Sequence, residues 1–573
     1  MKLKQWIAST TALALVFTLA TFSAPQKAQA LTTEVTIELV TEGSSGTGGN
    51  GMSFSPTLSN DGTTIVFHSE ANDLVSGTTT PGYSIFAYDA ISGETTYVSA
   101  GSSPLGDNNH PSVSADGNLV VISSYNAFLV PGITTGSSFN IFLYDLAAAT
   151  VTLVTPGATG TGGDDSSFSQ SISADGSKIA FASRATDLID GITTTGTNVF
   201  LYDVASATTT LVTPGLSGTG SDSVSAQCQI SADGNRIVFI SSAGDLIDGM
   251  STYGYDNVYL YDVPSATTSI ISAGASGVGA NNICGAPVIS ADGTKIVFES
   301  WATDLVSGMT TTGPHNIFLY DTVSATTTLI TAGSSGTGSD GVSRGPSISA
   351  DGAKIAFHSL SSDLVDGMPA TERQNIFLYD VASATTTLIT TGPLGTGGND
   401  ASLFPSISAD GTRIAFYSSA TDLIEGTTTD NLNNIYLYTF TTYALVTFDA
   451  DNGDAVATAK TVLGTMVREP AEPVYAGHTF EGWFTSGDTL WVFGDPVTDD
   501  MVLTARWSVA PETPVEPEVP LEPEVPIEPD TRIEPDIPQT GDLVPLVPIA
   551  LIALAGFALS TVSINRRRRH DRA

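Results

Sequence analysis

Paired acids recur in this chain in the pattern Asp-Leu-x-x-Gly, and their oxygen atoms could bind a cation. Four copies carry two acids each, at Asp187 and Asp190, Asp245 and Asp248, Asp363 and Asp366, and Asp422 and Glu425. Calcium prefers oxygen-rich loops of this kind. Alternatively, the first Asp accepts hydrogen bonds from the amides of its own turn. Both interpretations stay open, and calcium is the one cofactor that the sequence suggests.

No catalytic motif accompanies these acids. The chain has no Gly-x-Ser-x-Gly elbow, because its one such sequence, at 341–345, leads into a predicted strand and not into a helix. It also lacks His-Glu-x-x-His and a Gly-rich phosphate loop followed by Lys. His68 and His358 occupy equivalent places, but no position of the repeat described below gathers the histidines into one site. The sequence therefore predicts a protein that is not an enzyme.

Two cysteines, Cys228 and Cys284, complete the set of reactive side chains. They stand in adjacent repeats, and a pair outside the cell can be oxidised. They lie five and eight residues ahead of their Asp-Gly turns, so they are out of register by about three residues. Because a bridge needs Cα atoms within about 7 Å, the sequence leaves a disulfide open.

A unit of 55 to 59 residues positions these side chains and returns seven times. Each copy has an Asp-Gly turn and, 27 or 28 residues later, a Tyr that ends an aromatic-rich run. The turn acids are Asp61, Asp116, Asp175, Asp233, Asp292, Asp351 and Asp410. A fixed period of this length indicates an array of units that bury their apolar surface against one another.

One unit contains four short β-branched or aromatic runs, which predict four strands. The central runs, such as 375–380, are apolar on both faces, as expected of a sheet packed between two others. The sequence therefore predicts an all-β chain whose residues 31–440 form a seven-bladed β-propeller of four-stranded blades. Residues 34–43 align with 207–215, the fourth strand of a complete unit, so the N-terminal strand should close the last blade.

The runs Ser-Ala-Asp-Gly-x-x-Ile-Ala-Phe at 173–181 and Asn-Ile-Phe-Leu-Tyr-Asp at 375–380 resemble the TolB-type, WD-like propeller repeat. The units are longer than the usual ~40–45 residues of that family. The extra length lies in two connections, as at 185–196 and 215–222, which leave an antiparallel blade at the same end. That end should be loop-rich and should carry any binding site.

The first and last segments indicate export. Residues 1–30 begin with Lys2 and Lys4, continue with an apolar run and end with Ala28-Gln-Ala30, the layout of a signal peptide cleaved after Ala30. Residues 509–536 are rich in Pro and Glu and should form an extended linker.

Residues 537–573 contain Ile537, Pro538, Gln539, Thr540 and Gly541, then an apolar span at 543–564 and an Arg tail. This resembles a cell-wall sorting signal of the Leu-Pro-x-Thr-Gly type, with Ile537 in place of Leu. The resemblance implies cleavage after Thr540 by a sortase and linkage to peptidoglycan. The alternative is a plain membrane anchor.

Residues 441–508 form a separate segment with Phe480-Glu-Gly-Trp483 and a terminal Ala505-Arg-Trp507. This segment resembles the internalin B-repeat, and that resemblance implies a small β-grasp-like module that acts as a stalk or accessory binding module.

The 573-residue chain has 59 acidic and 20 basic residues and a net charge of −39, which disfavours nucleic acid as a partner. We expect an extracellular monomer anchored to the bacterial cell wall, with a propeller that binds an unidentified protein or glycan. The alternative is a secreted hydrolase or lyase with a site at the mouth of the propeller channel.

Overall fold

The computed structural model describes residues 31–510, apart from 78–81, 100–108, 137, 193, 251, 308–314, 334–335, 369–371, 394, 427–428 and 430. Every named element in this part of the chain is a β-strand. Within it, no helix has the length and apolar character needed to cross a membrane. The expected signal peptide, the sorting signal and all but the first two residues of the linker lie outside the described residues.

The sixth repeat illustrates how one blade forms. Its four antiparallel strands are β22 (Ser343–Ile348), β23 (Lys354–Ser359), β24 (Asn375–Asp380) and β25 (Thr385–Leu388), in that order. Ile376 and Phe377 point to opposite faces of β24, and both are fully buried. The apolar central strands are therefore covered on both sides, as the sequence predicts.

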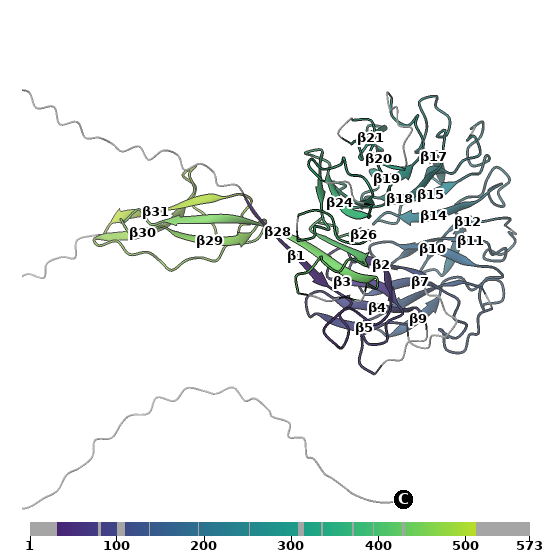
Figure 1. Cartoon of the computed structure of the whole chain (residues 1–573), viewed down its shortest axis with the longest axis horizontal. Helices are drawn as coiled ribbons and strands as arrows, with labels where there is room; N and C mark the ends of the chain where they lie inside the picture. The colour runs from purple at the N-terminus through teal and green to yellow at the C-terminus, as the bar shows by residue number, and fades with distance from the viewer. Residues whose placement is uncertain are drawn as a thin grey trace, which may run out of the picture. The chain divides into compact units, whose positions relative to one another are not determined.

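Five other repeats form the same four-stranded sheet. They are β2 (Ser53–Leu58), β3 (Thr64–Ser69), β4 (Ser84–Asp89) and β5 (Glu94–Tyr97); β6 (Asn109–Val113), β7 (Leu119–Ser124), β8 (Asn140–Asp145) and β9 (Thr150–Leu153); β10 (Ser167–Ile172), β11 (Lys178–Ser183), β12 (Asn198–Asp203) and β13 (Thr208–Leu211); β14 (Ser225–Ile230), β15 (Arg236–Ser241), β16 (Asn257–Asp262) and β17 (Thr267–Ile270); and β18 (Cys284–Ile289), β19 (Lys295–Ser300), β20 (Asn316–Asp321) and β21 (Thr326–Leu329). Figure 1 shows the first strands, such as β2, β10 and β14, converging on the centre, and fourth strands such as β5 and β17 at the rim.

The seventh repeat does not form a blade of this kind, so the prediction of seven four-stranded blades is wrong. The structure has six four-stranded blades. The remaining strands, β26 (Ser402–Ile407), β27 (Arg413–Ser418) and β28 (Asn434–Asp449), belong to a seven-stranded sheet that continues into the small C-terminal module. We call β26, β27, the first half of β28 and β1 the composite sector.

The composite sector lacks the Asp that ends the third strand of each of the six blades. In the six blades, an Asp ends the third strand, and its carboxylate accepts amide hydrogen bonds of the next turn, as Asp380 does from Ser383 (2.9 Å). The equivalent residue in the seventh repeat is Thr439. Thr439 has no carboxylate to cap a turn, and β28 runs past it to Asp449, for 16 residues in all.

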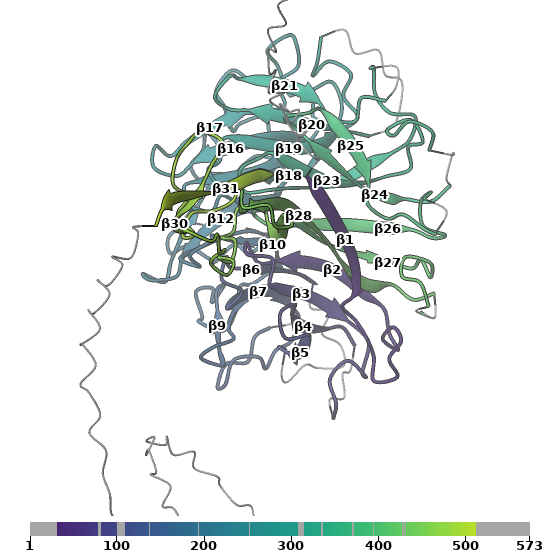
Figure 2. The same cartoon turned by 90° about the vertical axis from the view of Figure 1, so that its left-hand side faces the viewer.

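The N-terminal strand β1 (Thr32–Leu39) takes the place of the missing fourth strand. It pairs antiparallel with β28, from Leu39 opposite Tyr436 to Thr32 opposite Tyr443. Figure 2 shows β1, in purple, beside β28. The predicted pairing of the N-terminal strand with the last repeat is confirmed.

A buried asparagine network fixes the ends of the sheets. Asn375 Oδ1 accepts hydrogen bonds from the Thr390 hydroxyl (3.0 Å) and the Gly398 amide (3.1 Å). In the composite sector, Asn434 Oδ1 accepts the same two bonds from Thr41 (2.9 Å) and Gly49 (3.1 Å). The N-terminal segment therefore supplies the polar contacts of a fourth strand as well as its backbone.

Hydrogen bonds between neighbouring sheets close the ring around its centre. The Ala350 amide donates to the Ala409 carbonyl (3.0 Å), and the Ala409 amide donates to Asn60 (2.9 Å). Asn60 belongs to the first repeat and Ala409 to the last, so this contact joins the two ends. A core that combines Phe67 of β3 with Ala415 and Leu437 of the composite sector covers the same seam.

The small module follows directly from β28. Its other strands are β29 (Ala457–Val462), β30 (His478–Phe484) and β31 (Met501–Val509). The sheet is mixed, because β29 is antiparallel to β28 whereas β31 is parallel to it. Its core packs Phe448 against Trp483 and Leu503. Residues 441–509 contain no helix, so the segment is a purely β version of the module expected there.

Candidate ligand-binding site

The two long connections of each unit meet at one end of the sheets. Asp187, in the loop after β11, accepts hydrogen bonds from the amides of Asp164 (3.0 Å) and Ala158 (3.1 Å). Those two amides belong to the connection between β9 and β10. The loops after the second and fourth strands are thus tied together, and this end of the propeller is loop-rich.

The calcium candidates serve this loop contact. The first acid of each pair accepts the amide of a residue 23 positions earlier: Asp164 to Asp187 (3.0 Å), Asp222 to Asp245 (3.0 Å), Asp340 to Asp363 (3.1 Å) and Asn399 to Asp422 (2.9 Å). The second acids, Asp190, Asp248, Asp366 and Glu425, are exposed. Among the described residues, no three His, Cys, Asp or Glu side chains are grouped so that they could hold a metal. The hydrogen-bond interpretation therefore accounts for the first acids, with the amides coming from the neighbouring loop and not from their own turn.

The two cysteines are free and buried. The Cys228 thiol donates to the Ser169 carbonyl (3.0 Å), and the Cys284 thiol lies 3.2 Å from the Ser300 hydroxyl. The disulfide that the sequence left open is thus not formed. Burial raises the pKa of Cys228 to about 12 and that of Cys284 to about 11, so neither thiol is a nucleophile at neutral pH.

Two hollows flank the centre and the seam of the ring. A narrow cavity of about 170 Å³ is lined by equivalent small and apolar residues of all repeats, such as Ser347, Ile348 and Ala350. Its wall is sealed by bonds such as Ile407 N to Ser347 Oγ (3.1 Å). A larger hollow of about 520 Å³ lies beside β1, away from the histidines. We place the candidate site in neither hollow. A cluster of aromatic, histidine and charged side chains lies instead at the loop-rich end of the innermost strands.

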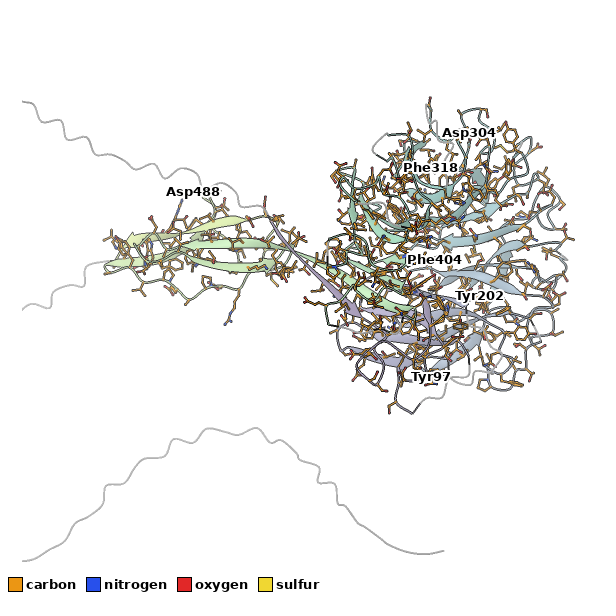
Figure 3. The ribbon with its side chains drawn as sticks, in the orientation of Figure 1. Tyr97, Tyr202, Asp304, Phe318, Phe404 and Asp488 are labelled. Atoms are coloured by element: carbon orange, nitrogen blue, oxygen red, sulfur yellow. The ribbon has the colours of Figure 1, made fainter. Side chains whose placement is uncertain are left out.

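A β-bulge opens this end in every repeat. The pairing of the first strand with the second shifts register, as between Arg344 and Ser347 in the sixth repeat. At the bulge the backbone turns to positive φ, and Phe404 does so at 48° although it is not glycine. Bulges re-aim side chains next to functional sites, and Phe404 is left 49% exposed near the middle of the propeller (Figure 3).

The position opposite the bulge varies strongly between otherwise uniform repeats. It is occupied in chain order by His68, Ser123, Ala182, Ile240, Glu299, His358 and Tyr417. Core and turn positions cannot vary in this way, because every unit needs them. Beside the uniform core and turn positions, the variation at this strand position indicates that these side chains serve something other than the fold.

Aromatic and histidine rings from repeats six, seven and one form a continuous arc here. Successive ring centroids are 5.1 Å apart for His358 and Phe404, 5.8 Å for Phe404 and Tyr417, 5.2 Å for Tyr417 and Phe54, 5.6 Å for Phe54 and His68, and 5.4 Å for His68 and Tyr83. The arc crosses the seam where the first and last repeats meet. Such contacts stabilise the rings by about 0.5–1.5 kcal/mol per pair and hold them in fixed positions.

A charged cluster extends the arc into the fifth repeat. Glu299 Oε1 lies 3.4 Å from His315 Nδ1, and its Oε2 accepts the Gly345 amide at 3.0 Å. Arg344 donates to His315 Nε2 (3.1 Å) and lies over the Trp301 ring, 6.0 Å from its centroid. We call the arc and this cluster the channel mouth: Phe54, His68, Tyr83, Glu299, Trp301, His315, Arg344, His358, Phe404 and Tyr417.

Electrostatics fix the charges at the mouth. Burial raises the pKa of Glu299, but the hydrogen bonds from His315 and the Gly345 amide outweigh it, so the pKa lies below its ordinary value and the carboxylate is ionised. Burial lowers the pKa of His358 to about 4, and this imidazole is neutral. Its Nδ1 accepts the Phe404 amide (3.3 Å), which a protonated ring could not do.

Acid should destabilise the fold through His358. An unfolded His titrates near 6.5, so between about pH 6.5 and 4 the unfolded chain binds a proton that the folded chain does not. We expect this residue alone to remove up to about 3 kcal/mol of stability as the pH falls through that window. Denaturant unfolding of His358→Gln should show a shallower loss than the parent chain, whereas His478→Gln in the small module should not. Equal pH slopes for parent and His358→Gln would contradict the expectation.

The sequence missed this site. We expected that no repeat position gathers the histidines into one site. The structure places His68, His315 and His358 in the channel mouth, where they contact Phe54, Trp301 and Phe404 respectively. His478 lies in the small module, and the His110 side chain is outside the described part of the structure. The available signal was the variation at the His358 position among seven nearly identical units.

Comparison with known proteins supports the assignment of the small module. Residues 445–506 match the family model of the Listeria-Bacteroides repeat domain. A stretch of 67 residues is 33% identical to a protein of Evansella cellulosilytica named as a Gly-rich membrane protein. That stretch is 11% of this chain and 8% of the relative, so the chain spans a small part of that protein.

Several solved structures share the propeller fold at low identity. TolB from Acinetobacter baumannii is 16% identical, with 58% of this chain and 62% of that chain covered and a TM-score of 0.33. An oligogalacturonate lyase in complex with manganese is 12% identical, with 71% and 96% covered and a TM-score of 0.42. An acylaminoacyl peptidase from Pyrococcus horikoshii is 13% identical, with 72% and 58% covered and a TM-score of 0.41. Likenesses of this size support no conclusion about this chain. The sheets described above make the chain a β-propeller repeat protein, and residues 445–506 match the Listeria-Bacteroides repeat domain.

Proposed function

We propose that this chain is a bacterial surface protein, held to the cell wall through 537–573, whose propeller binds a protein or glycan without altering it. The observation that carries the binding function is the channel mouth. Trp301 is 38% exposed and Phe404 49%, whereas aromatic residues of the central strands, such as Phe298 and Phe377, are fully buried. Large aromatic side chains left open beside a few fixed polar groups are typical of ligand sites.

The export and sorting features support display outside the cell. A signal peptide, an extended Pro/Glu linker and the Ile537–Gly541 motif would place the propeller at a distance from the membrane. In that setting sortase and peptidoglycan are the attachment partners. The ligand would then come from the medium or from the surface of another cell.

The binding function predicts that ligand affinity depends on the mouth and not on the opposite end. Purified full chain is screened on glycan and extracellular protein arrays, together with Trp301→Ala and Phe404→Ala. Each substitution should weaken binding at least about tenfold, because an anchoring aromatic contributes 2 kcal/mol or more. Ile91→Ala and Val323→Ala remove exposed apolar residues from turns at the other end and should bind normally. Loss of binding in these controls, with the mouth variants unaffected, would overturn the assignment.

A hydrolase or lyase is the second candidate function, and one observation favours it. The carboxylate of Glu299 lies 3.4 Å from His315 Nδ1, and this pair would suit a general base if a bound ligand drew Arg344 away from His315 Nε2. The same screen therefore includes a turnover assay for each ligand found. Release of new chain ends that disappears in His315→Gln would replace the binding proposal with an enzymatic one.

A further inference from the structure

The basic residues of the propeller fall into two groups. At the tight-turn end, each of repeats three to seven has one basic residue that contacts its own or the next blade, as Arg413 does with the Gly62 carbonyl (2.7 Å) and Lys295 with Asp321 (2.8 Å). The others at this end are Lys178, Arg236 and Lys354. Arg373 pairs with Asp400 at 3.3 Å. These cations hold the ring together.

Arg184 and Arg344 differ from this group. Each lies over an aromatic ring at the loop-rich end, Arg184 over Phe168 (5.7 Å) and Arg344 over Trp301 (6.0 Å). Among the described residues, no carboxylate lies within ion-pair distance of Arg344. In a chain with a net charge of −39, an exposed guanidinium without an acidic partner is unusual.

The neighbours of Arg344 hold it in one orientation. A guanidinium can only donate, so the contact with His315 Nε2 requires that this nitrogen carry no proton. The imidazole proton then sits on Nδ1, which faces the ionised Glu299. Glu299 is fixed in turn by the Gly345 amide. One N–H of Arg344 is used in this chain of contacts, and the remaining donors of its planar fork are free to bind an anion.

The surroundings of Arg344 suit a carbohydrate ring. Trp301 is partly exposed directly beneath the guanidinium, and it also contacts His315 at a centroid distance of 4.0 Å. A ligand that packs an apolar C–H face on the indole while directing a carboxylate to Arg344 would satisfy both groups. A sugar ring bearing a carboxyl group has this combination.

A peptide fits the mouth less well. Peptides commonly add to a free strand edge, which requires open backbone amides. At the mouth these amides are taken by side chains: Ala286 by Gln227 (2.8 Å), Gly345 by Glu299 (3.0 Å) and Phe404 by His358 (3.3 Å). The innermost strands therefore offer side chains and not a strand edge.

We infer that Arg344 and Trp301 form a subsite for the carboxylate of an acidic sugar within a glycan. The inference rests on the proposed function, because it names the ligand class of the same mouth. His315 and Glu299 act here as positioning residues that hold the guanidinium toward the ligand. The interaction should weaken as salt is raised.

The test uses purified full chain with hyaluronan, alginate and polygalacturonate, each beside its carboxyl-reduced counterpart, and with poly-glutamate. At least one acidic glycan should bind more tightly than its reduced form. Arg344→Gln should weaken that binding by about 10- to 100-fold, the effect of removing a charged hydrogen bond, and should leave reduced glycans unaffected. Arg344→Lys should retain part of the affinity. Arg184→Gln, which removes the matched guanidinium over Phe168, should bind as the parent does.

Several outcomes would overturn the inference. Equal binding of acidic and reduced glycans, or unchanged binding of acidic glycans by Arg344→Gln, would reject the carboxylate subsite. If Trp301→Ala still weakened binding in that case, the mouth would remain the binding site. Poly-glutamate bound through Arg344 in place of glycans would assign the site to an acidic peptide. Binding to neutral glycans or proteins that is lost in Trp301→Ala, with no acidic glycan bound, would reject the inference and keep the proposed function. Binding indifferent to Trp301 and Phe404 would reject both.

Discussion

A chain that begins at Ser44 in place of Leu31 is expected to lose most of the stability of its propeller. The deletion removes β1 and with it the backbone pairing along β28 from Leu39 to Thr32. It also removes Thr41, whose hydroxyl donates to the fully buried Asn434 and accepts the amide of the fully buried Ile435. Net backbone hydrogen bonds of about 1 kcal/mol each and an unsatisfied buried amide of about 1–3 kcal/mol together approach the whole stability of a typical domain.

Thermal unfolding of the two chains measures this effect, and limited proteolysis shows whether the composite sector opens first. Thr41→Val is the matched control, because it keeps β1 and removes only the hydroxyl that donates to Asn434. We expect it to cost about 1–3 kcal/mol. A shortened chain that melts at the temperature of the parent would show that β1 does not hold the ring closed.

Replacing Thr540 with Ala is expected to transfer the protein from the wall fraction to the membrane or the medium. The sorting resemblance implies that the chain is cut between Thr540 and Gly541 and is joined to peptidoglycan through the Thr540 carbonyl. The substitution alters the residue at which the acyl-enzyme forms but leaves the apolar span at 543–564 intact. Wall digestion followed by immunoblotting of each fraction measures the shift.

Thr531→Ala, in the linker just ahead of the motif, is the matched control and should remain in the wall fraction. Ile537→Leu restores the residue usual in such signals and should be retained at least as well as the parent. Protein still covalently bound to peptidoglycan after Thr540→Ala would mean that the motif is not the attachment site and would favour a plain membrane anchor.

Much of the fold follows from local features of the repeat. The two-sided apolar strands, such as 375–380, lie buried on both faces, and the N-terminal strand pairs where its similarity to 207–215 placed it. The loop-rich end also lies where the long connections predict. These features depend on contacts within one repeat or between identical repeats, and one unit is enough to see them.

The composite sector and the channel mouth depend on differences between repeats. Thr439 in place of an Asp lets β28 continue into the small module, a change that looks minor beside six intact copies. His358 and His68 are 290 residues apart in sequence, and ring closure alone brings their neighbours Phe404, Tyr417 and Phe54 into one arc. The features that all repeats share predict the fold. The composite sector and the channel mouth depend on residues that differ between repeats, so the shared features alone do not reveal them.

The parallel pairing of β28 with β31 has a mechanical consequence. In the proposed anchored state, a ligand held by the propeller would pull on the start of this part of β28, while the wall would pull on the end of β31 after Val509. The two strands run in the same direction and pair from Val446 with Met501 to Asp449 with Thr504. Tension would therefore act along the strands from opposite ends and load these hydrogen bonds together in shear, without peeling them one by one. In that state the module would bear a steady load between the cell wall and the bound ligand.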